Sequence, residues 1–310
     1  MRLWGVLALA AIGCGGGSSA KSMYIDGFNP PPMNANEKAV VSPVFPQIPP
    51  GTDETLCSYL DTTFTDATDI INFRAFQSIP GHHVMLTAVR RSQDPNTHPC
   101  TEDDMVNILT FVAGGGAEGT THFQGVPAGL GFRIPAGTQL MLQSHWINAT
   151  TEAHDGQAVI YLQAQPTSDA ITPTDQFLAD TEQFMVPAGQ TAQATTTCPF
   201  QEDVNFWLVG GHMHEWGKHI RIELLDTNAS ATTIYDQDWQ PAYMTDPPDN
   251  FFTKDQPFVI KTGQSIRVTC QWDNTKGGAD LRFPTEMCYF VGYYFPGHGM
   301  RDCSDGAWPQ

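Results

Sequence analysis

Histidines that could bind a metal ion occur in groups in this chain. The candidates are His82, His83, His145, His212 and His214. Alternate residues of a β-strand point to the same face, so His212 and His214 can offer two imidazoles to a single ion. His82 and His83 would face opposite sides of a regular strand. Their joint use therefore requires a bulge, a strand end or different ring nitrogens, and the preceding glycine makes such a departure feasible.

Met287, in the segment TEMCYFVGYY, is a further candidate ligand. A methionine in a strand normally fills a hydrophobic core. Its thioether is also a soft ligand that suits Cu(I), whereas zinc, calcium and magnesium have little use for it. Other histidines have no partner at ligand spacing, and we expect them at the surface or behind the site: His98, His122, His154, His219 and His298.

Short β-strands must position these residues, because the composition disfavours a helical bundle. Gly and Pro contribute 28 and 23 of the 310 residues, and both interrupt helices. Only Glu102–Phe111 predicts a helix. This pattern predicts an all-β protein of antiparallel sandwiches or jelly rolls. The β-prone runs, separated by turn residues, cover 71–76, 82–89, 138–146, 158–164, 205–210, 219–225, 265–272 and 287–295.

The length and the charge of the chain limit its possible domain organisation and its possible partners. A chain of 310 residues is long enough for two domains, and the polar segment QPTSDAITPTD (165–175) is the expected boundary. The net charge of −18 would repel phosphate backbones and anionic headgroups, which excludes nucleic acid as a partner. The expected divisions are a signal peptide (1–14), a flexible tether with a Pro-rich extended lead-in (15–50), a first domain (51–168) and a second domain (169–310).

The start of the chain is typical of an exported lipoprotein. Residues 1–14, MRLWGVLALAAIGC, combine one Arg, a short apolar stretch and small residues before Cys14, the expected lipidation site. An ordinary signal peptide is the alternative. We expect a monomeric periplasmic or cell-surface lipoprotein, on the outer membrane, that touches the membrane only through this anchor. The other cysteines are even in number and predict disulfides: Cys57, Cys100, Cys198, Cys270, Cys288 and Cys303.

Four segments together resemble the copper type II, ascorbate-dependent monooxygenases, the family of peptidylglycine α-hydroxylating monooxygenase and dopamine β-monooxygenase. The segments are HHVM (82–85), QSHW (143–146), HMHEWGK (212–218) and EMCYFVGYY (286–294). The similarity runs from about Leu56 to Cys303. It implies two tandem jelly-roll β-sandwich domains, each with one copper ion, that face each other across a solvent-filled cleft.

The resemblance also implies roles for the candidate ligands. The three-histidine, electron-transfer copper site matches His82, His83 and His145, and the catalytic site, where oxygen and substrate react, matches His212, His214 and Met287. Two copper ions per chain would be reduced by ascorbate or an equivalent one-electron donor. A small organic substrate and O2 would then give a hydroxylated product and water. The implied disulfides are Cys57–Cys100, Cys198–Cys303 and Cys270–Cys288.

Two further residues are expected to bind the cofactors. Gln143 matches a Gln of the peptide-hydroxylating relative on the path between the copper sites, and Tyr289 follows Met287 by two residues. The peptide hydroxylases grip their substrate's carboxylate with an Arg, an Asn and a Tyr, but this chain has Gly210, Tyr289 and Val291 there. A peptidylglycine substrate is therefore not expected, and a neutral one should be preferred.

Two other functions fit part of this pattern. A non-catalytic periplasmic copper-binding lipoprotein would also use histidine and methionine ligands, but a storage protein would be expected to cluster many Met or Cys ligands at one place. A zinc hydrolase needs a general base beside an open three-ligand site, and Glu215 is the nearby carboxylate in the sequence. That function would leave Met287 without a purpose.

Overall fold

The computed structural model describes residues 23–61, 64–116, 123–244 and 246–308 of the chain. Regular structure in these residues is almost entirely β-strand, so the predicted all-β class is confirmed. Every β-prone run predicted from the sequence overlaps an observed strand. Runs of β-prone residues bounded by turn residues therefore located these strands.

The α-helix is shorter than the sequence predicts. It was expected over Glu102–Phe111, but α1 spans only Glu102–Val106. Asn107 follows it, and its side-chain amide donates a hydrogen bond to the Arg91 carbonyl at 2.9 Å. The apolar run that starts at Ile108 then continues as a strand, because its side chains are buried against the rest of the sheet.

The strands before residue 174 form the N-terminal half (residues 23–173). They make a sheet ordered β1-β11-β4-β8-β12, a sheet ordered β6-β3-β9-β5-β7 that we call the β9 sheet, and the pair β10-β2. The predicted Pro-rich lead-in contains β1, which pairs with β11 and so belongs to a sheet instead of resting on one. The strands are β1 (Glu37–Val41), β2 (Phe45–Ile48), β3 (Asp53–Tyr59), β4 (Thr68–Gln77), β5 (Gly81–Val89), β6 (Asn96–Pro99), β7 (Ile108–Gly116), β8 (Leu130–Ile134), β9 (Leu140–Ile147), β10 (His154–Gly156), β11 (Ala158–Pro166) and β12 (Thr172–Pro173).

The remaining strands form the C-terminal half (residues 174–308). They make a sheet ordered β18-β15-β21-β13-β22, which we call the β15 sheet, with β19 also paired to β15. A second sheet is ordered β14-β20-β16-β17. The elements are β13 (Asp175–Asp180), β14 (Thr191–Pro199), β15 (Val204–His212), β16 (Gly217–Leu225), β17 (Ala231–Asp238), η1 (Pro241–Met244, a 3-10 helix), β18 (Asn250–Phe251), β19 (Phe258–Ile260), β20 (Ser265–Asp273), β21 (Tyr289–Phe295) and β22 (Arg301–Ser304).

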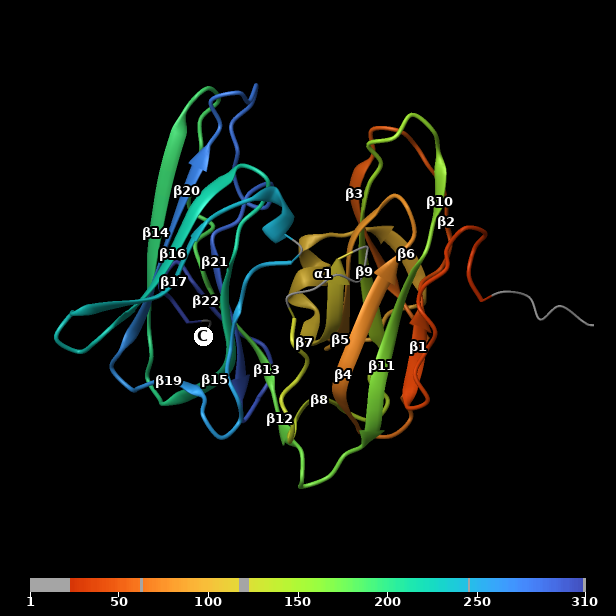
Figure 1. Ribbon diagram of the computed structural model, residues 1–310, viewed down its shortest axis with the longest axis horizontal. Coiled ribbons are helices and arrows are strands. Elements are labelled where there is room, and N and C mark those ends of the chain that lie inside the picture. Colours follow the sequence, from red (N-terminus) through yellow and green to blue (C-terminus); the bar gives the residue numbers. More distant parts are fainter. Residues whose placement is uncertain (1–22, 62–63, 117–122, 245, 309–310) are drawn as a thin grey trace, which may run out of the picture.

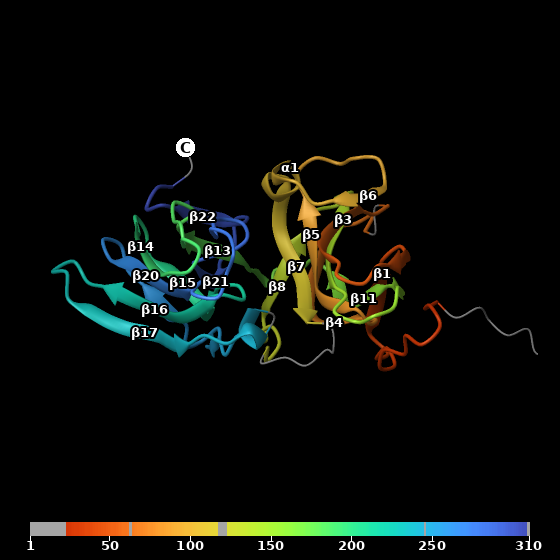
Figure 2. The ribbon, with the colours of Figure 1, turned by 90° about the horizontal axis from the view of Figure 1, so that it is seen from above.

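The two halves lie side by side, and the chain passes from one to the other through β12 and β13 at the bottom of Figure 1. Figure 2 shows β7 and β8 as the strands of the N-terminal half nearest to the C-terminal half. Tyr293 of β21 enters the core of the N-terminal half, where its ring centroid lies 5.4 Å from those of Phe111 and Phe132. Apolar packing therefore holds the halves together. Among the described strands no sheet combines both halves, and the predicted jelly-roll connectivity stays a prediction.

Candidate metal centres

Three histidines come together on the face of the β9 sheet that points away from the core of the N-terminal half. His83 of β5 lies directly opposite His145 of β9 in the antiparallel ladder. The register shifts between Gly81 and His83, and this irregularity brings His82 to the same place. The Nδ1 atom of His82 lies 3.2 Å from that of His145 and 3.3 Å from that of His83. A departure from regular strand geometry, as predicted, thus allows adjacent histidines to converge. We call these residues the three-His group.

The residue before the histidine pair must be glycine for this packing. A Cβ atom on Gly81 would lie 2.4 Å from the Gln77 Cβ and 2.8 Å from the Ser78 carbonyl oxygen. The Gly81 N–H also donates to the Ser78 carbonyl at 2.7 Å, which closes the turn that leads into β5. A larger residue would push the start of β5 away and separate the imidazoles.

Burial favours the neutral imidazoles of His82 and His83. It lowers the pKa of His82 to about 4, with a further lowering by the charge of His145, and it lowers the pKa of His83 well below its ordinary value. His145 Nε2 lies 2.7 Å from the Asp53 carboxylate, so Nε2 carries the proton and Nδ1 keeps its lone pair. Ring nitrogens of the three residues all lie within 4.8 Å of one another. Such a set of neutral nitrogen donors suits copper or zinc.

A second set of candidate ligands lies where β15 ends and β21 begins. The ladder pairs Gly210 with Val291 and His212 with Tyr289, and the same register continued by two residues sets His214 opposite Met287. Directly opposed residues of a ladder share a face, so this register would bring His214 and Met287 to the side of the sheet that carries His212, although both lie beyond the paired ends of β15 and β21. The rings of His212 and His214 are 5.1 Å apart between centroids. We call these three residues the His-His-Met group.

The hydrogen bonding and burial of His214 and His212 also suit a metal ligand. His214 Nδ1 donates to the Thr285 carbonyl at 3.0 Å, which leaves Nε2 with its lone pair. Burial, followed by the charge of His214, lowers the pKa of His212 to about 3. Burial likewise lowers the pKa of His214. Both rings are therefore expected to be neutral near pH 7.

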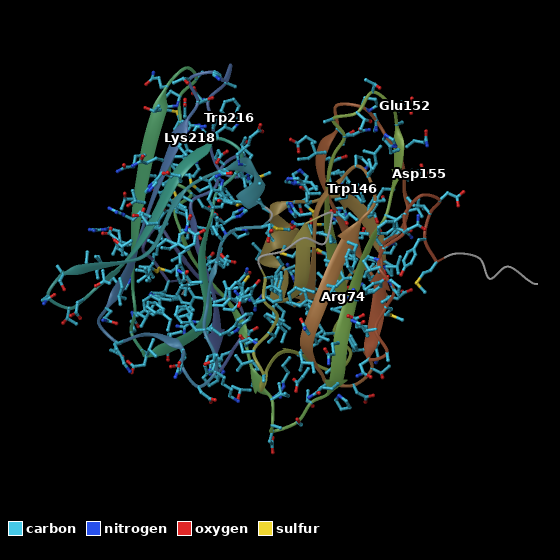
Figure 3. All side chains as sticks on the ribbon, in the orientation of Figure 1. Arg74, Trp146, Glu152, Asp155, Trp216 and Lys218 are labelled. Atoms are coloured by element: carbon cyan, nitrogen blue, oxygen red, sulfur yellow. A yellow bond between two sulfur atoms is a disulfide. The ribbon has the colours of Figure 1, made fainter. Side chains whose placement is uncertain are left out.

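A buried carboxylate, Glu286, ties the His-His-Met group together. Its side chain accepts the backbone N–H of His214 at 3.1 Å, the backbone N–H of Trp216 at 2.7 Å and the indole N–H of Trp272 at 3.0 Å. Burial raises the pKa of Glu286 to about 7. Figure 3 labels Trp216 on the C-terminal half and Trp146, the neighbour of His145, on the N-terminal half. Because Glu286 directly precedes Met287 in the chain, these hydrogen bonds tie the segment that contains His214 and Trp216 to the neighbour of Met287.

The two groups lie near each other in space. The charges of His212 and His214 contribute to the lowered pKa of His83, and the charge of His145 contributes to that of His214. Such mutual effects require the groups to be close in space, because protein electrostatic interactions decay with distance and screening. The structure therefore brings together residues about 130 positions apart in the sequence on the two sides of one interface.

The residues expected to bind cofactors lie on the same two faces. Gln143 belongs to the β9 sheet opposite Met85, and its side-chain amide lies 3.5 Å from the sulfur of Met105 in α1. Tyr289 lies opposite His212 on one side and Asp180 on the other, and it is half-buried. Gln143 thus points toward α1 in this structure, whereas Tyr289 directly flanks the His-His-Met group.

Sequence reasoning missed the carboxylates that support the imidazoles. Glu215, the candidate base of a zinc hydrolase, is exposed, whereas Glu286 and Asp53 make the contacts described above. Glu286 could have been suspected because it precedes Met287. Asp53 could not, because only the pairing of β3 with β9 brings it beside His145. His98 and His219 contact Asp104 and Asp236 instead of the metal-ligand candidates, in agreement with the expectation for them.

Three disulfides join Cys57 to Cys100, Cys198 to Cys303 and Cys270 to Cys288. These are the pairs that the family resemblance implies, and such bonds are typical of exported proteins. The predicted signal peptide and Cys14 lie outside the described residues. In the part of the chain that is described, no helix has the length and apolar character needed to cross a membrane.

Comparisons with known proteins do not assign the chain to a family. No family model matches it, and no curated protein matches it. A structure of Sulfolobus Turreted Icosahedral Virus aligns with 84% of this chain and 56% of its own, at 8% identity and a TM-score of 0.25. PNGase F of Flavobacterium meningosepticum aligns over 87% and 91%, at 9% identity and a TM-score of 0.31. A variant of oxalate decarboxylase from Bacillus subtilis aligns over 88% and 70%, at 8% identity and a TM-score of 0.20. The chain thus spans little more than half the length of the viral chain, and all three likenesses are too distant to indicate a function.

Proposed function

We propose that this protein is a copper type II, ascorbate-dependent monooxygenase that hydroxylates a C–H bond of a small organic substrate. The convergence of three Nδ1 atoms in the three-His group, opposite a second pair of neutral imidazoles, is the observation that carries the proposal. The two groups differ in their donors, because the second adds the thioether of Met287, which the register of β15 and β21, continued past the ladder, sets opposite His214. Two unlike copper sites close to each other suit an enzyme that must deliver two electrons one at a time.

The residues present fit copper in both places. The three-His group would hold one ion through nitrogen alone, and the His-His-Met group would hold the other through two imidazoles and a neutral thioether that favours Cu(I). Copper, when bound, supplies one-electron redox chemistry and the activation of O2. The low pKa values of His82 and His212 mean that no proton competes for the ring nitrogens of these two ligands at neutral pH.

The proposed reaction balances with external electrons and protons. The substrate R–H, O2, two electrons and two protons give R–OH and water, and two molecules of a one-electron donor such as ascorbate supply the electrons. Tyr289 and Val291 flank His212 and Gly210 in the ladder, so they are placed to orient the substrate beside the His-His-Met group. Neither side chain offers a cation that would hold a carboxylate, which supports a substrate other than a glycine-extended peptide.

A non-catalytic copper-binding lipoprotein remains the alternative function. It would bind the same two ions but would not need unlike donor sets facing one another. A zinc hydrolase gains no support, because Glu215 is exposed and Glu286 already uses its oxygens to accept three hydrogen bonds. We also propose that the protein is exported, lipidated at Cys14 and located on the outer membrane. The signal-like start of the sequence supports this location.

Turnover of the copper-loaded protein tests the proposal. Protein loaded with two equivalents of copper would be reduced anaerobically with ascorbate and then mixed with O2 and a panel of small substrates. We expect O2 consumption matched by hydroxylated product, and its loss in both His214→Ala and His145→Ala, each of which should retain one tightly bound copper. Binding of two copper ions without product from any substrate would favour the non-catalytic alternative. Hydrolysis without O2 would overturn the proposal.

A further inference from the structure

Exposed apolar side chains gather at one end of the N-terminal half. Among the described residues, six large apolar side chains are exposed: Met23, Met33, Val44, Ile79, Val106 and Met185. Three of these, Met23, Val44 and Ile79, are 60%, 45% and 71% exposed and belong to segments that meet at the start of β11. We call these three residues the apolar patch. Single exposed apolar residues are ordinary on a protein surface, whereas a group of them indicates a binding surface.

Gln157, directly before β11, connects two members of the patch. Its side-chain amide donates to the Met23 carbonyl at 3.5 Å and accepts the Ile25 N–H at 2.9 Å. Its backbone carbonyl accepts the Ser78 N–H at 2.9 Å. Ile79 follows Ser78 in the turn between β4 and β5. Met23 and Ile79 therefore both adjoin the same glutamine.

Val44 lies at the same end of the sheet. Ser42, two residues before it, donates its backbone N–H at 2.9 Å to the carbonyl of Ala158, the first residue of β11. Ala158 pairs with Gln77, the last residue of β4, and β1 pairs with β11 on the other side. Neighbouring strands lie about 4.8 Å apart, so the segments that carry Val44 and Ile79 leave the sheet about 10 Å from each other. The patch thus surrounds the start of β11.

The described part of the chain begins at this patch. Phe28 is buried against Tyr161, so the chain is fixed to the N-terminal half soon after Met23. With a lipid on Cys14, as proposed, eight residues (15–22) separate the anchor from Met23, and they span at most about 30 Å. The anchor therefore holds the patch close to the membrane surface.

Contact with a membrane at this end leaves the candidate metal centres accessible. Val44 connects β1 to β2, and Figure 1 shows these strands on the side of the N-terminal half that is remote from the C-terminal half. The three-His group and the His-His-Met group lie between the halves instead. A flat surface bound at the patch would thus not cover the region between the halves.

Acidic side chains beside the patch determine which surface fits it. Asp26 follows Ile25, Asp155 lies two residues before Gln157, and both are exposed. These charges, like the net charge of −18, repel anionic headgroups. The apolar side chains favour contact with lipid. The surface that matches both features is a bilayer of zwitterionic phospholipids.

We propose that the apolar patch of Met23, Val44 and Ile79 inserts into the headgroup region of a zwitterionic phospholipid bilayer and fixes the orientation of the protein on the membrane. The inference rests on the proposed lipidation of Cys14, because the anchor brings the patch to the surface. It replaces the expectation that the protein touches the membrane only through this anchor. The lipid supplies most of the affinity, and burial of the patch selects one orientation.

The accessibility of a nitroxide label tests this inference on lipidated, metal-free protein bound to vesicles of phosphatidylcholine and phosphatidylethanolamine. The label is attached to one introduced cysteine, because disulfides occupy six native cysteines and the lipid occupies Cys14. Oxygen concentrates in lipid, whereas a nickel chelate stays in water. The ratio of collisions with oxygen to collisions with the chelate should be at least about threefold higher in Ile79→Cys than in Val106→Cys. Val106 is the matched control, because it is 70% exposed on α1.

A second variant tests whether the patch acts as a unit. Adding Met23→Ser and Val44→Ser to the Ile79→Cys protein should lower the collision ratio to the value of the Val106→Cys control. An undiminished ratio in this folded variant would overturn the joint role of the three side chains. Thermal unfolding checks that each labelled protein is folded before the ratios are compared.

The outcomes separate the patch from the proposed anchor. Equal ratios at positions 79 and 106, in protein whose Cys14 carries lipid by mass spectrometry, would overturn the patch and leave the proposed location intact. A label at position 79 that is shielded from both reagents as the protein concentration rises would overturn it in favour of a second copy of the chain. Absence of lipid on Cys14 would overturn the anchor. Sedimentation of the unlipidated protein with the same vesicles, lost in the Met23→Ser, Val44→Ser variant, would then support the patch, and no sedimentation would overturn it.

Discussion

The three-His group and the His-His-Met group are held in place by different means. His83 and His145 are opposite each other inside a ladder of two long strands, and the carboxylate bonded to His145, that of Asp53, belongs to a side chain that is 73% exposed. His214 and Met287 lie beyond the paired ends of β15 and β21, where the ladder no longer fixes them. Buried Glu286 and the Cys270–Cys288 bond hold that region instead. The first site is thus built by sheet pairing, and the second by hydrogen bonds to a buried carboxylate and by a disulfide.

The two halves also differ in whether their buried carboxylates have a cationic partner. In the N-terminal half, Asp69 pairs with Arg133 at 2.7 Å, and Arg74 bonded to Glu37 at 2.6 Å holds the pKa of Glu37 below its ordinary value. In the C-terminal half, burial without a cation raises the pKa of acidic residues such as Asp180, Asp249 and Glu286. An uncompensated acid costs stability unless a proton or a ligand neutralises it. The C-terminal half therefore holds several buried acids whose pKa values are raised because no cation compensates them.

Removing the Glu286 side chain should have the largest effect. Glu286→Ala leaves the N–H groups of His214, Trp216 and Trp272 without an acceptor in a buried place, so we expect the free energy of unfolding to fall by about 4 kcal/mol. Glu286→Gln keeps one acceptor oxygen and should cost about half as much. Urea unfolding of the metal-free proteins measures both values. Equal stability of Glu286→Ala and wild type would mean that the network does not hold this region.

Opening the disulfide beside Met287 should have the next largest effect. The Cys270–Cys288 bond closes a sequence separation of 18 residues, so replacing both cysteines by Ser should cost about 3 kcal/mol. Cu(I) affinity should also fall at the His-His-Met group, while the three-His group keeps its affinity. The matched control removes Cys57–Cys100, which should leave the His-His-Met affinity unchanged. Unfolding curves measure the loss of stability, and competition with a Cu(I) chelator measures the affinity of the His-His-Met group. Equal losses of this affinity in both double variants would contradict a specific role of the Cys270–Cys288 bond at this group.

The buried pair Asp180–Asp302 should make stability depend on pH. Burial, and then the neighbouring Asp302, raise the pKa of Asp180 from 3.8 to about 8, so the folded protein keeps a proton that the unfolded chain releases above about pH 4. Stability is thus fully present in acid and falls as the pH rises toward 8, by at most about 1.4 kcal/mol per pH unit. Asp180→Asn should flatten this slope. Unfolding free energies at pH 5.5, 7 and 8.5 compare the two proteins; parallel slopes would refute this role.

The smallest effect should follow from Asp53→Asn at the other site. The variant keeps the shape of the side chain but weakens the hydrogen bond that orients His145, so copper affinity of the three-His group should fall by about tenfold. Stability should change by less than about 0.5 kcal/mol, because Asp53 is mostly exposed. Isothermal titration with copper in a His214→Ala background measures binding at the three-His group alone. Unchanged copper affinity of the three-His group in the Asp53→Asn protein would contradict this role of the hydrogen bond.

The sequence predicted the strands and the ligand candidates better than their surroundings. Runs of β-prone residues between turn residues located β5, β9, β15 and β21. The rings of His212 and His214 lie 5.1 Å apart, but His214 lies beyond the end of β15. The helix after residue 102 was overestimated because tertiary pairing overrides local propensity at Ile108.

Supporting residues from distant strands could not be found in the same way. Asp53 meets His145 across 92 positions, and Glu286 meets His214 across 72. Asp249 reaches Gly210 only because β18 pairs with β15. Such contacts follow from which strands become neighbours in a sheet, and no local pattern in one sequence encodes that choice.

X-ray absorption at the copper edge tests the central claim most directly, because it counts sulfur ligands. Wild-type protein loaded with copper and reduced with ascorbate should contain about two copper ions per chain and show sulfur at one of them, since the thioether of Met287 prefers Cu(I). Met287→Ile should keep both imidazole signals, lose the sulfur signal and bind Cu(I) more weakly at that site. Sulfur coordination that persists in Met287→Ile, or its absence from the wild type, would contradict the account.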